Sequence, residues 1–126
     1  MRLLVPITII LIAIIGFGLW VNSSLHSSTL ILTEQIEQVN NEIRQGNWEK
    51  AVEEVEKLEN DWKKEIKWWP ALLDHQEIDN IEFSLAKIKE YVINESKALS
   101  LGQLSELQLM LEHIPEKEKV ILKNIL

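Results

Sequence analysis

The chain has 126 residues, with 13 basic and 20 acidic side chains, a formal net charge of −7 and no cysteine. This length leaves room for one domain at most. The lack of cysteine excludes disulfides, thiolate metal ligands and thiol nucleophiles. The acidic balance, without a basic stripe to offset it, predicts that the chain does not bind nucleic acid.

The N-terminal 21 residues predict a helix that crosses a membrane. Leu3 to Val21 is an uncharged run in which Thr8 is the only polar side chain. A helix of this length spans roughly 28 Å, close to the hydrocarbon thickness of about 30 Å. We interpret residues 1–21 as a transmembrane signal anchor. The alternative is a cleaved signal peptide, with residues 21–23 as a poor cleavage site.

The charges next to this run predict its orientation. Arg2 and the terminal amine are the only positive charges near either end, because no further basic residue occurs until Arg44. The positive-inside rule therefore predicts a cytoplasmic N-terminus and an extracytoplasmic C-terminal domain. The remainder of the chain has 12 basic and 20 acidic residues, a net charge of −8.

Residues 22–29 are polar and rich in serine, which indicates a flexible neck or a continuation of the membrane helix. Residues 30–126 then form an acidic all-helical domain. Its first helix has an apolar face that begins in the preceding segment, and Gly46 and Asn47 suit the end of this helix and the start of the next. The residues of this face are Leu25, Leu32, Ile36, Val39 and Ile43.

The second helix shows the clearest helical spacing in the chain, and Pro70 ends it. Three tryptophans lie on its apolar face, which makes it the main core element. This face comprises Trp48, Val52, Val55, Leu58, Trp62, Ile66 and Trp69.

Two further helices complete the pattern. A third helix has one apolar stripe, and residues 94–96 are a break before a fourth helix at roughly Lys97–His113. The capping-box spacing of Ser100 and Gln103 offers Ser100 as an alternative start of this helix. Pro115 then opens a short C-terminal helix. The stripe of the third helix comprises Leu72, His75, Ile78, Ile81, Leu85, Ile88 and Val92. The predicted fold is all-α, a transmembrane helix followed by a helical-hairpin domain of about four helices and the short C-terminal helix.

Two resemblances follow from these patterns. Gly46-Asn47-Trp48-Glu49-Lys50-Ala51 resembles the start of the second helix of a tetratricopeptide repeat, although the preceding helix lacks the Leu-Gly pair. A general helical hairpin describes residues 30–58 better.

The whole chain resembles a family of uncharacterised single-pass membrane proteins from spore-forming Firmicutes, classified as a domain of unknown function. The residues that carry this resemblance are Trp48, Ala51, Trp62, Trp69, His75-Gln76-Glu77-Ile78-Asp79, Ile81, Tyr91, His113-Ile114-Pro115-Glu116 and Lys123-Asn124-Ile125. It implies a protein of the bacterial cell membrane and a partner among other small membrane proteins. It implies no activity.

Four residues are candidates for partner contact or a polar network. His75 and Asp79 are one helical turn apart, and His113 could join them in a metal or pH-sensing site. A half-buried histidine satisfied by local hydrogen bonds is the structural alternative for His75. Trp68 lies off the apolar stripe, either packed over the third helix or exposed as a partner-binding anchor. We predict no catalytic residue, no metal site and no cofactor.

The function predicted from these features is a membrane-anchored helical interaction domain, a partner or accessory subunit of another envelope protein. The absence of a nucleophile elbow or phosphate-binding glycine loop argues against an enzyme. The alternative is an extracytoplasmic sensor or ligand-binding module that uses His75, Asp79 and His113. A third option is a subunit whose anchor packs inside a larger membrane complex, since Gly16 and Gly18 permit close helix approach.

Overall fold

The computed structural model describes the backbone of residues 2–71 and 73–125, and the side chains of these residues except 68, 70, 71 and 115–125. This described part is all-helical, as predicted. Its elements in chain order are α1 (Leu4–Arg44), α2 (Trp48–Glu65), the 3-10 helix η1 (Ile66–Ala71), α3 (His75–Ile93) and α4 (Lys97–Ile125).

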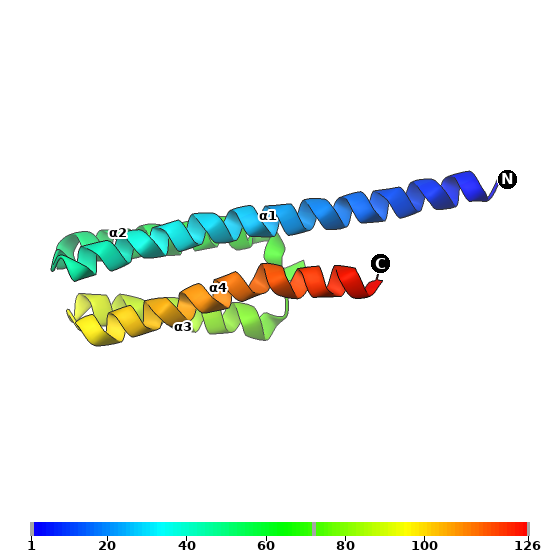
Figure 1. Ribbon diagram of the computed structural model, residues 1–126. Helices are drawn as coiled ribbons and strands as arrows, with labels where there is room; N and C mark the ends of the chain where they lie inside the picture. Colours follow the sequence, from blue (N-terminus) through cyan, green and yellow to red (C-terminus); the bar gives the residue numbers. More distant parts are fainter. Residues whose placement is uncertain (1, 72, 126) are drawn as a thin grey trace.

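The four α-helices form an antiparallel bundle in which consecutive helices run in opposite directions (Figure 1). α1 packs against α2 and α4, and α3 packs against the same two helices, so α1 and α3 occupy opposite corners. Each helix directs its apolar stripe to the common centre. The most deeply buried side chains of this core include Leu25, Ile36, Val39, Leu58, Trp69, Ile81, Ile88, Leu104 and Leu107.

α1 consists of two halves with different surroundings. Its N-terminal half, residues 4–20, extends beyond the bundle, and its side chains are exposed except at Ile15 and Gly18, which are half-buried (Figure 1). Val21 is the first buried residue, with 6% of its surface exposed, and Leu25 is fully buried. This extension is one long apolar helix, consistent with a membrane anchor or with a signal sequence.

Residues 22–29, interpreted from the sequence as a neck or a helical continuation, are part of α1 and join the bundle. Two of their hydroxyl groups donate hydrogen bonds, one within α1 and one to α2. Thr29 Oγ1 donates to the carbonyl of His26 at 2.9 Å, and Ser28 Oγ donates to Glu65 Oε2 at 2.5 Å. Ser28 and Thr29 are therefore compatible with the helix, because their hydroxyl groups have acceptors while the backbone stays helical.

Both turns at the end of the bundle away from the apolar extension have the same hydrogen-bond pattern. At the first turn Gly46 has φ +75°, and the Asn47 amide donates to the Glu42 carbonyl at 2.9 Å. At the second turn Glu95 has φ +55°, and the Ser96 amide donates to the Tyr91 carbonyl at 2.9 Å. This is the Schellman pattern, which satisfies the last carbonyls of α1 and α3. Both breaks were predicted.

Three helix boundaries differ from the sequence prediction. The α-helical part of the second helix ends at Glu65. The chain continues as the 3-10 helix η1, which contains Trp69. The third begins at His75, with Asp74 as its N-cap residue. α4 runs through Pro115 to Ile125 instead of restarting there, because a proline removes one hydrogen bond and can be accommodated without ending a helix.

Candidate functional site

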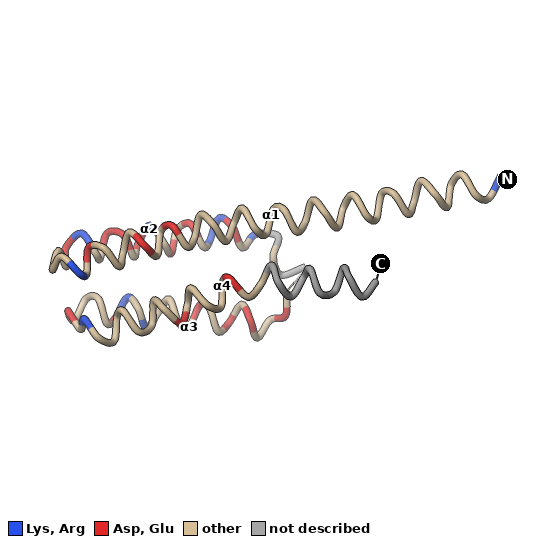
Figure 2. Tube along the Cα trace, in the orientation of Figure 1, with Lys and Arg blue, Asp and Glu red and all other residues tan. Residues whose placement is uncertain are grey.

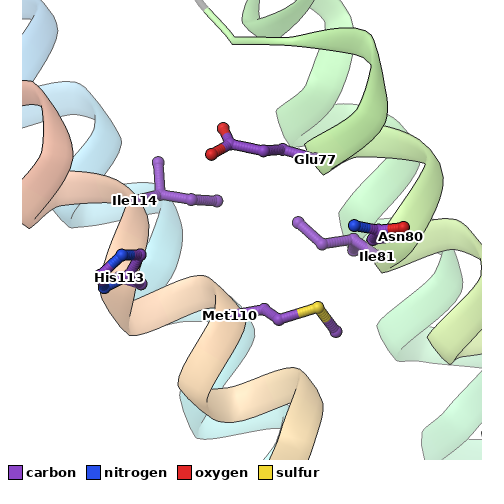
Figure 3. Close-up of a pocket in the computed structure, with 6 residues that line it drawn as sticks. All are labelled: Glu77, Asn80, Ile81, Met110, His113 and Ile114. Carbon is purple, nitrogen blue, oxygen red and sulfur yellow. The ribbon is translucent and has the colours of Figure 1, made fainter.

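A cleft between α3 and α4 lies near the end of the bundle from which the apolar extension emerges. It is lined by Glu77, Asn80, Ile81, Met110, His113 and Ile114. Glu77 and Ile81 project from α3 toward α4, and Met110 and Ile114 project from α4 toward α3 (Figure 3). The cleft holds about 100 Å³. Binding sites for drug-sized molecules occupy roughly 300–1,000 Å³, so this cleft fits a protruding side chain better than a free ligand.

A second, wider groove of about 440 Å³ separates α2 from α3. Its charged groups interact across the groove. Lys89 Nζ lies 3.5 Å from Glu59 Oε1, and Trp62 Nε1 donates to Glu82 Oε1 at 3.4 Å. These contacts join α2 to α3, so the groove is part of the packing between the two helices.

The structure separates the predicted polar residues. His75, predicted as half-buried, is exposed because it is the first residue of α3 and lies before the first buried position, Ile78. Asp79 follows one turn later and is also exposed. Neither residue lines the α3–α4 cleft, whereas His113 does. Among the described residues, no three His, Asp or Glu side chains are placed together to hold a metal ion.

The tryptophans differ in burial: Trp20 is exposed, Trp48 is half-buried and two others lie in the core. Trp62 and Trp69 are buried, as their positions on the apolar stripe predicted. Their rings meet edge to face with centroids 5.3 Å apart. The side chain of Trp68, a candidate partner-contact residue, lies outside the described part.

Sequence reasoning missed two exposed apolar side chains on the helices that form the α3–α4 cleft. Phe83 is 63% exposed and lies one helical turn after Asn80, which lines the cleft. Leu109 is 67% exposed and precedes Met110, another lining residue. Both are large apolar residues off the core stripes of their helices, and this property was the sequence signal that could have revealed them. We call Phe83, Leu109 and Met110 the α3–α4 apolar patch.

The architecture is that of an antiparallel four-helix bundle with an apolar helical extension. Residues 19–125 match the model of the family described as Domain of unknown function (DUF4363). The chain therefore belongs to the DUF4363 family, which confirms the resemblance to a domain of unknown function. The match begins two residues before Val21, where burial in the bundle starts. No curated protein and no solved structure matches the chain.

Proposed function

We propose that the protein is a single-pass protein of a bacterial cell membrane whose bundle binds another envelope protein, as its partner or accessory subunit, without catalysing a reaction. The observation that supports this proposal is the division of α1. Residues 4–20 are apolar and exposed, whereas the part of the same helix from Val21 onward supplies core residues to the bundle. A helix that is apolar on all sides suits a lipid environment.

The proposed orientation places the N-terminus in the cytoplasm and the bundle outside. Arg2 precedes the extension, which has no charged side chain of its own, and Figure 2 shows that the other charges begin within the bundle. Trp20 is 60% exposed at the junction, where an aromatic ring suits the headgroup level. Since the helix is continuous at this point, the anchor and the bundle are joined without a flexible linker.

The partner surface that we favour is the α3–α4 apolar patch. Exposed apolar side chains beside a small cleft are typical of protein contact sites. Methionine adapts its shape to different partners, so Met110 suits such a contact. The neighbouring cleft could receive one side chain of the partner, as an anchor residue fills a pocket at an interface hot spot.

Cysteine labelling tests the topology cleanly because the chain contains no native cysteine. We expect Glu53→Cys, on an exposed position of α2, to react with a membrane-impermeant maleimide in intact cells. We expect Leu3→Cys, which leaves Arg2 in place, to react only after lysis. The reverse pattern would refute the orientation. The intact mass of the purified protein separates a retained anchor from a cleaved signal sequence.

Site-specific photo-crosslinking tests the partner surface. A photoreactive amino acid at Leu109 should give a discrete crosslinked product in membranes of the native host, identified by mass spectrometry. The matched control is Leu30, an exposed apolar residue of α1, at the opposite corner of the bundle from α3. We expect Phe83→Ser to abolish the Leu109 product while the unfolding temperature is retained. Equal products at both positions, or none at Leu109, would overturn this assignment.

A further inference from the structure

The connection between α2 and α3 lies at the same end of the bundle as the apolar extension (Figure 1). The hydrogen bond from Ser28 to Glu65 fixes the end of α2 against α1. Ser28 lies seven residues after Val21, a rise of about 10 Å along the helix axis. From Glu65 the chain crosses this end of the bundle to α3 through η1, so this segment faces the membrane if residues 4–20 are inserted (Figure 1).

The end of α2 and η1 carry a local excess of positive charge. Residues 62–73 contain three lysines, Lys63, Lys64 and Lys67, and one acidic residue, Glu65, in a bundle segment whose overall charge is −8. All three lysines are exposed. The acidic residues Asp74 and Glu77 follow only at the start of α3.

We propose that Lys63, Lys64 and Lys67 form a contact surface for anionic phospholipid headgroups. This proposal rests on the membrane anchoring proposed above. Lysine carries its charge on a long flexible stem, which lets the ammonium reach headgroup phosphates from a backbone above the surface. The Debye length of about 8 Å at physiological ionic strength is comparable to the height of these residues above Val21. Basic residues next to a membrane helix bind anionic lipid in this way.

This contact has a structural consequence for the bundle. α1 attaches the bundle to the membrane at one point. A second contact through α2 would keep the α2–α3 side of the bundle close to the membrane. The tilt of the bundle relative to the membrane would then be fixed. The lysines would then act on the orientation of the domain, whereas the anchor acts on its location.

Hydrogen–deuterium exchange of the full chain in lipid vesicles tests the proposal. The protein is reconstituted in vesicles of phosphatidylcholine alone and in vesicles with about one third phosphatidylglycerol, an anionic lipid. We expect amide exchange in residues 62–73 to slow about threefold or more in the anionic vesicles, and this slowing to disappear in high salt. Exchange at the distal turn, residues 44–48, should be equal in both.

Two variants with the same change in charge provide the control. Lys63→Gln, Lys64→Gln and Lys67→Gln combined should remove the slowing. Lys50→Gln, Lys87→Gln and Lys97→Gln combined, at exposed positions on the bundle, should retain it. Equal exchange in the two lipids for the unchanged protein, or loss of the effect in both variants, would overturn the proposal. Vesicle flotation distinguishes failure of the lysine contact from failure of the membrane anchoring. Protein that floats with both lipids but shows no slowing of exchange refutes only the lysine contact. Protein that does not float refutes the anchoring as well.

Discussion

The indole of Trp69 meets the indole of Trp62 edge to face, with ring planes at 89°. Trp62 belongs to α2 and Trp69 to η1, so this contact folds the chain back over the end of the helix. Trp69 has no exposed surface and is the largest of the fully buried side chains. The pair fills the core at the end of the bundle where the apolar extension begins.

Replacing Trp69 by alanine should destabilise the bundle strongly. The lost burial and the remaining cavity should lower the free energy of unfolding by about 3–5 kcal/mol. Urea unfolding of the full chain in detergent, followed by circular dichroism, measures this loss. Trp48→Ala is the control, because Trp48 is only half-buried, and its loss should be less than half as large. Equal losses would contradict the central position of Trp69.

Two glycine substitutions should change the stability in opposite directions. Gly46 has φ +75°, and an added Cβ meets nothing within 4 Å, so Gly46→Ala should cost about 1–2 kcal/mol through the left-handed backbone alone. Gly102 lies inside α4, also with nothing within 4 Å of an added Cβ. Gly102→Ala should therefore stabilise the bundle by about 0.5–1 kcal/mol. Thermal unfolding should show a lower stability for Gly46→Ala and a higher stability for Gly102→Ala. A higher stability for Gly46→Ala would refute the turn geometry.

The hydrogen bond between Ser28 and Glu65 should make a small, measurable contribution. Ser28→Ala removes the hydroxyl while Glu65, which is half-buried, regains water, so the loss should be about 0.5–1.5 kcal/mol. Ser23→Ala serves as the control because Ser23 is exposed on the same helix. Chemical unfolding curves should separate the two variants, and an unaffected Ser28→Ala would show that the contact contributes nothing.

His75→Ala decides between the interaction domain and the metal-sensor alternative. His75 is exposed at the start of α3, so the substitution should change the free energy of unfolding by no more than about 0.5 kcal/mol. Adding zinc should not change the unfolding temperature of the protein without substitutions. A zinc-dependent rise that His75→Ala or His113→Ala removes would instead support the sensor.

Acidic substitutions should distinguish membrane insertion from ordinary exposure of apolar side chains. Ile10→Asp with Ile14→Asp places two carboxylates in the extension, at an insertion cost of about 5–7 kcal/mol. Leu30→Asp with Ile31→Asp changes two exposed residues in the bundle part of α1. We expect the first pair to release the protein from membranes during carbonate extraction and the second to retain it. Release by both pairs would contradict the proposed boundary near Val21.

The sequence predicted the helices and most of the core because apolar residues recur with helical spacing. Trp62 and Leu58, for example, lie on one stripe, and both are buried. It left open whether residues 22–29 form a flexible neck or a continuation of the helix. The partner that satisfies Ser28 is Glu65, which is 37 residues away, and a local pattern of serines does not reveal such a contact.

The candidate site was less predictable than the fold. His75 was assigned to the apolar stripe, but the start of α3 at this residue leaves it exposed, and helix ends depend on hydrogen bonds that spacing does not encode. Phe83 and Leu109 belong to α3 and α4, which pack against each other and form the cleft. That relationship is tertiary, so it appeared only with the folded chain.

Because α1 is uninterrupted, its length determines how far the distal turns of the bundle lie from the membrane. The 23-residue step from Val21 to Arg44 rises about 35 Å in a helix. In the proposed orientation, the turns at Gly46 and Glu95 stand at this distance above the hydrocarbon boundary, whereas the cleft at Ile114 lies close to it. A small membrane protein with little mass outside the bilayer could therefore reach the cleft but not the distal turns. A partner that binds the distal turns must itself extend about 35 Å from the membrane surface.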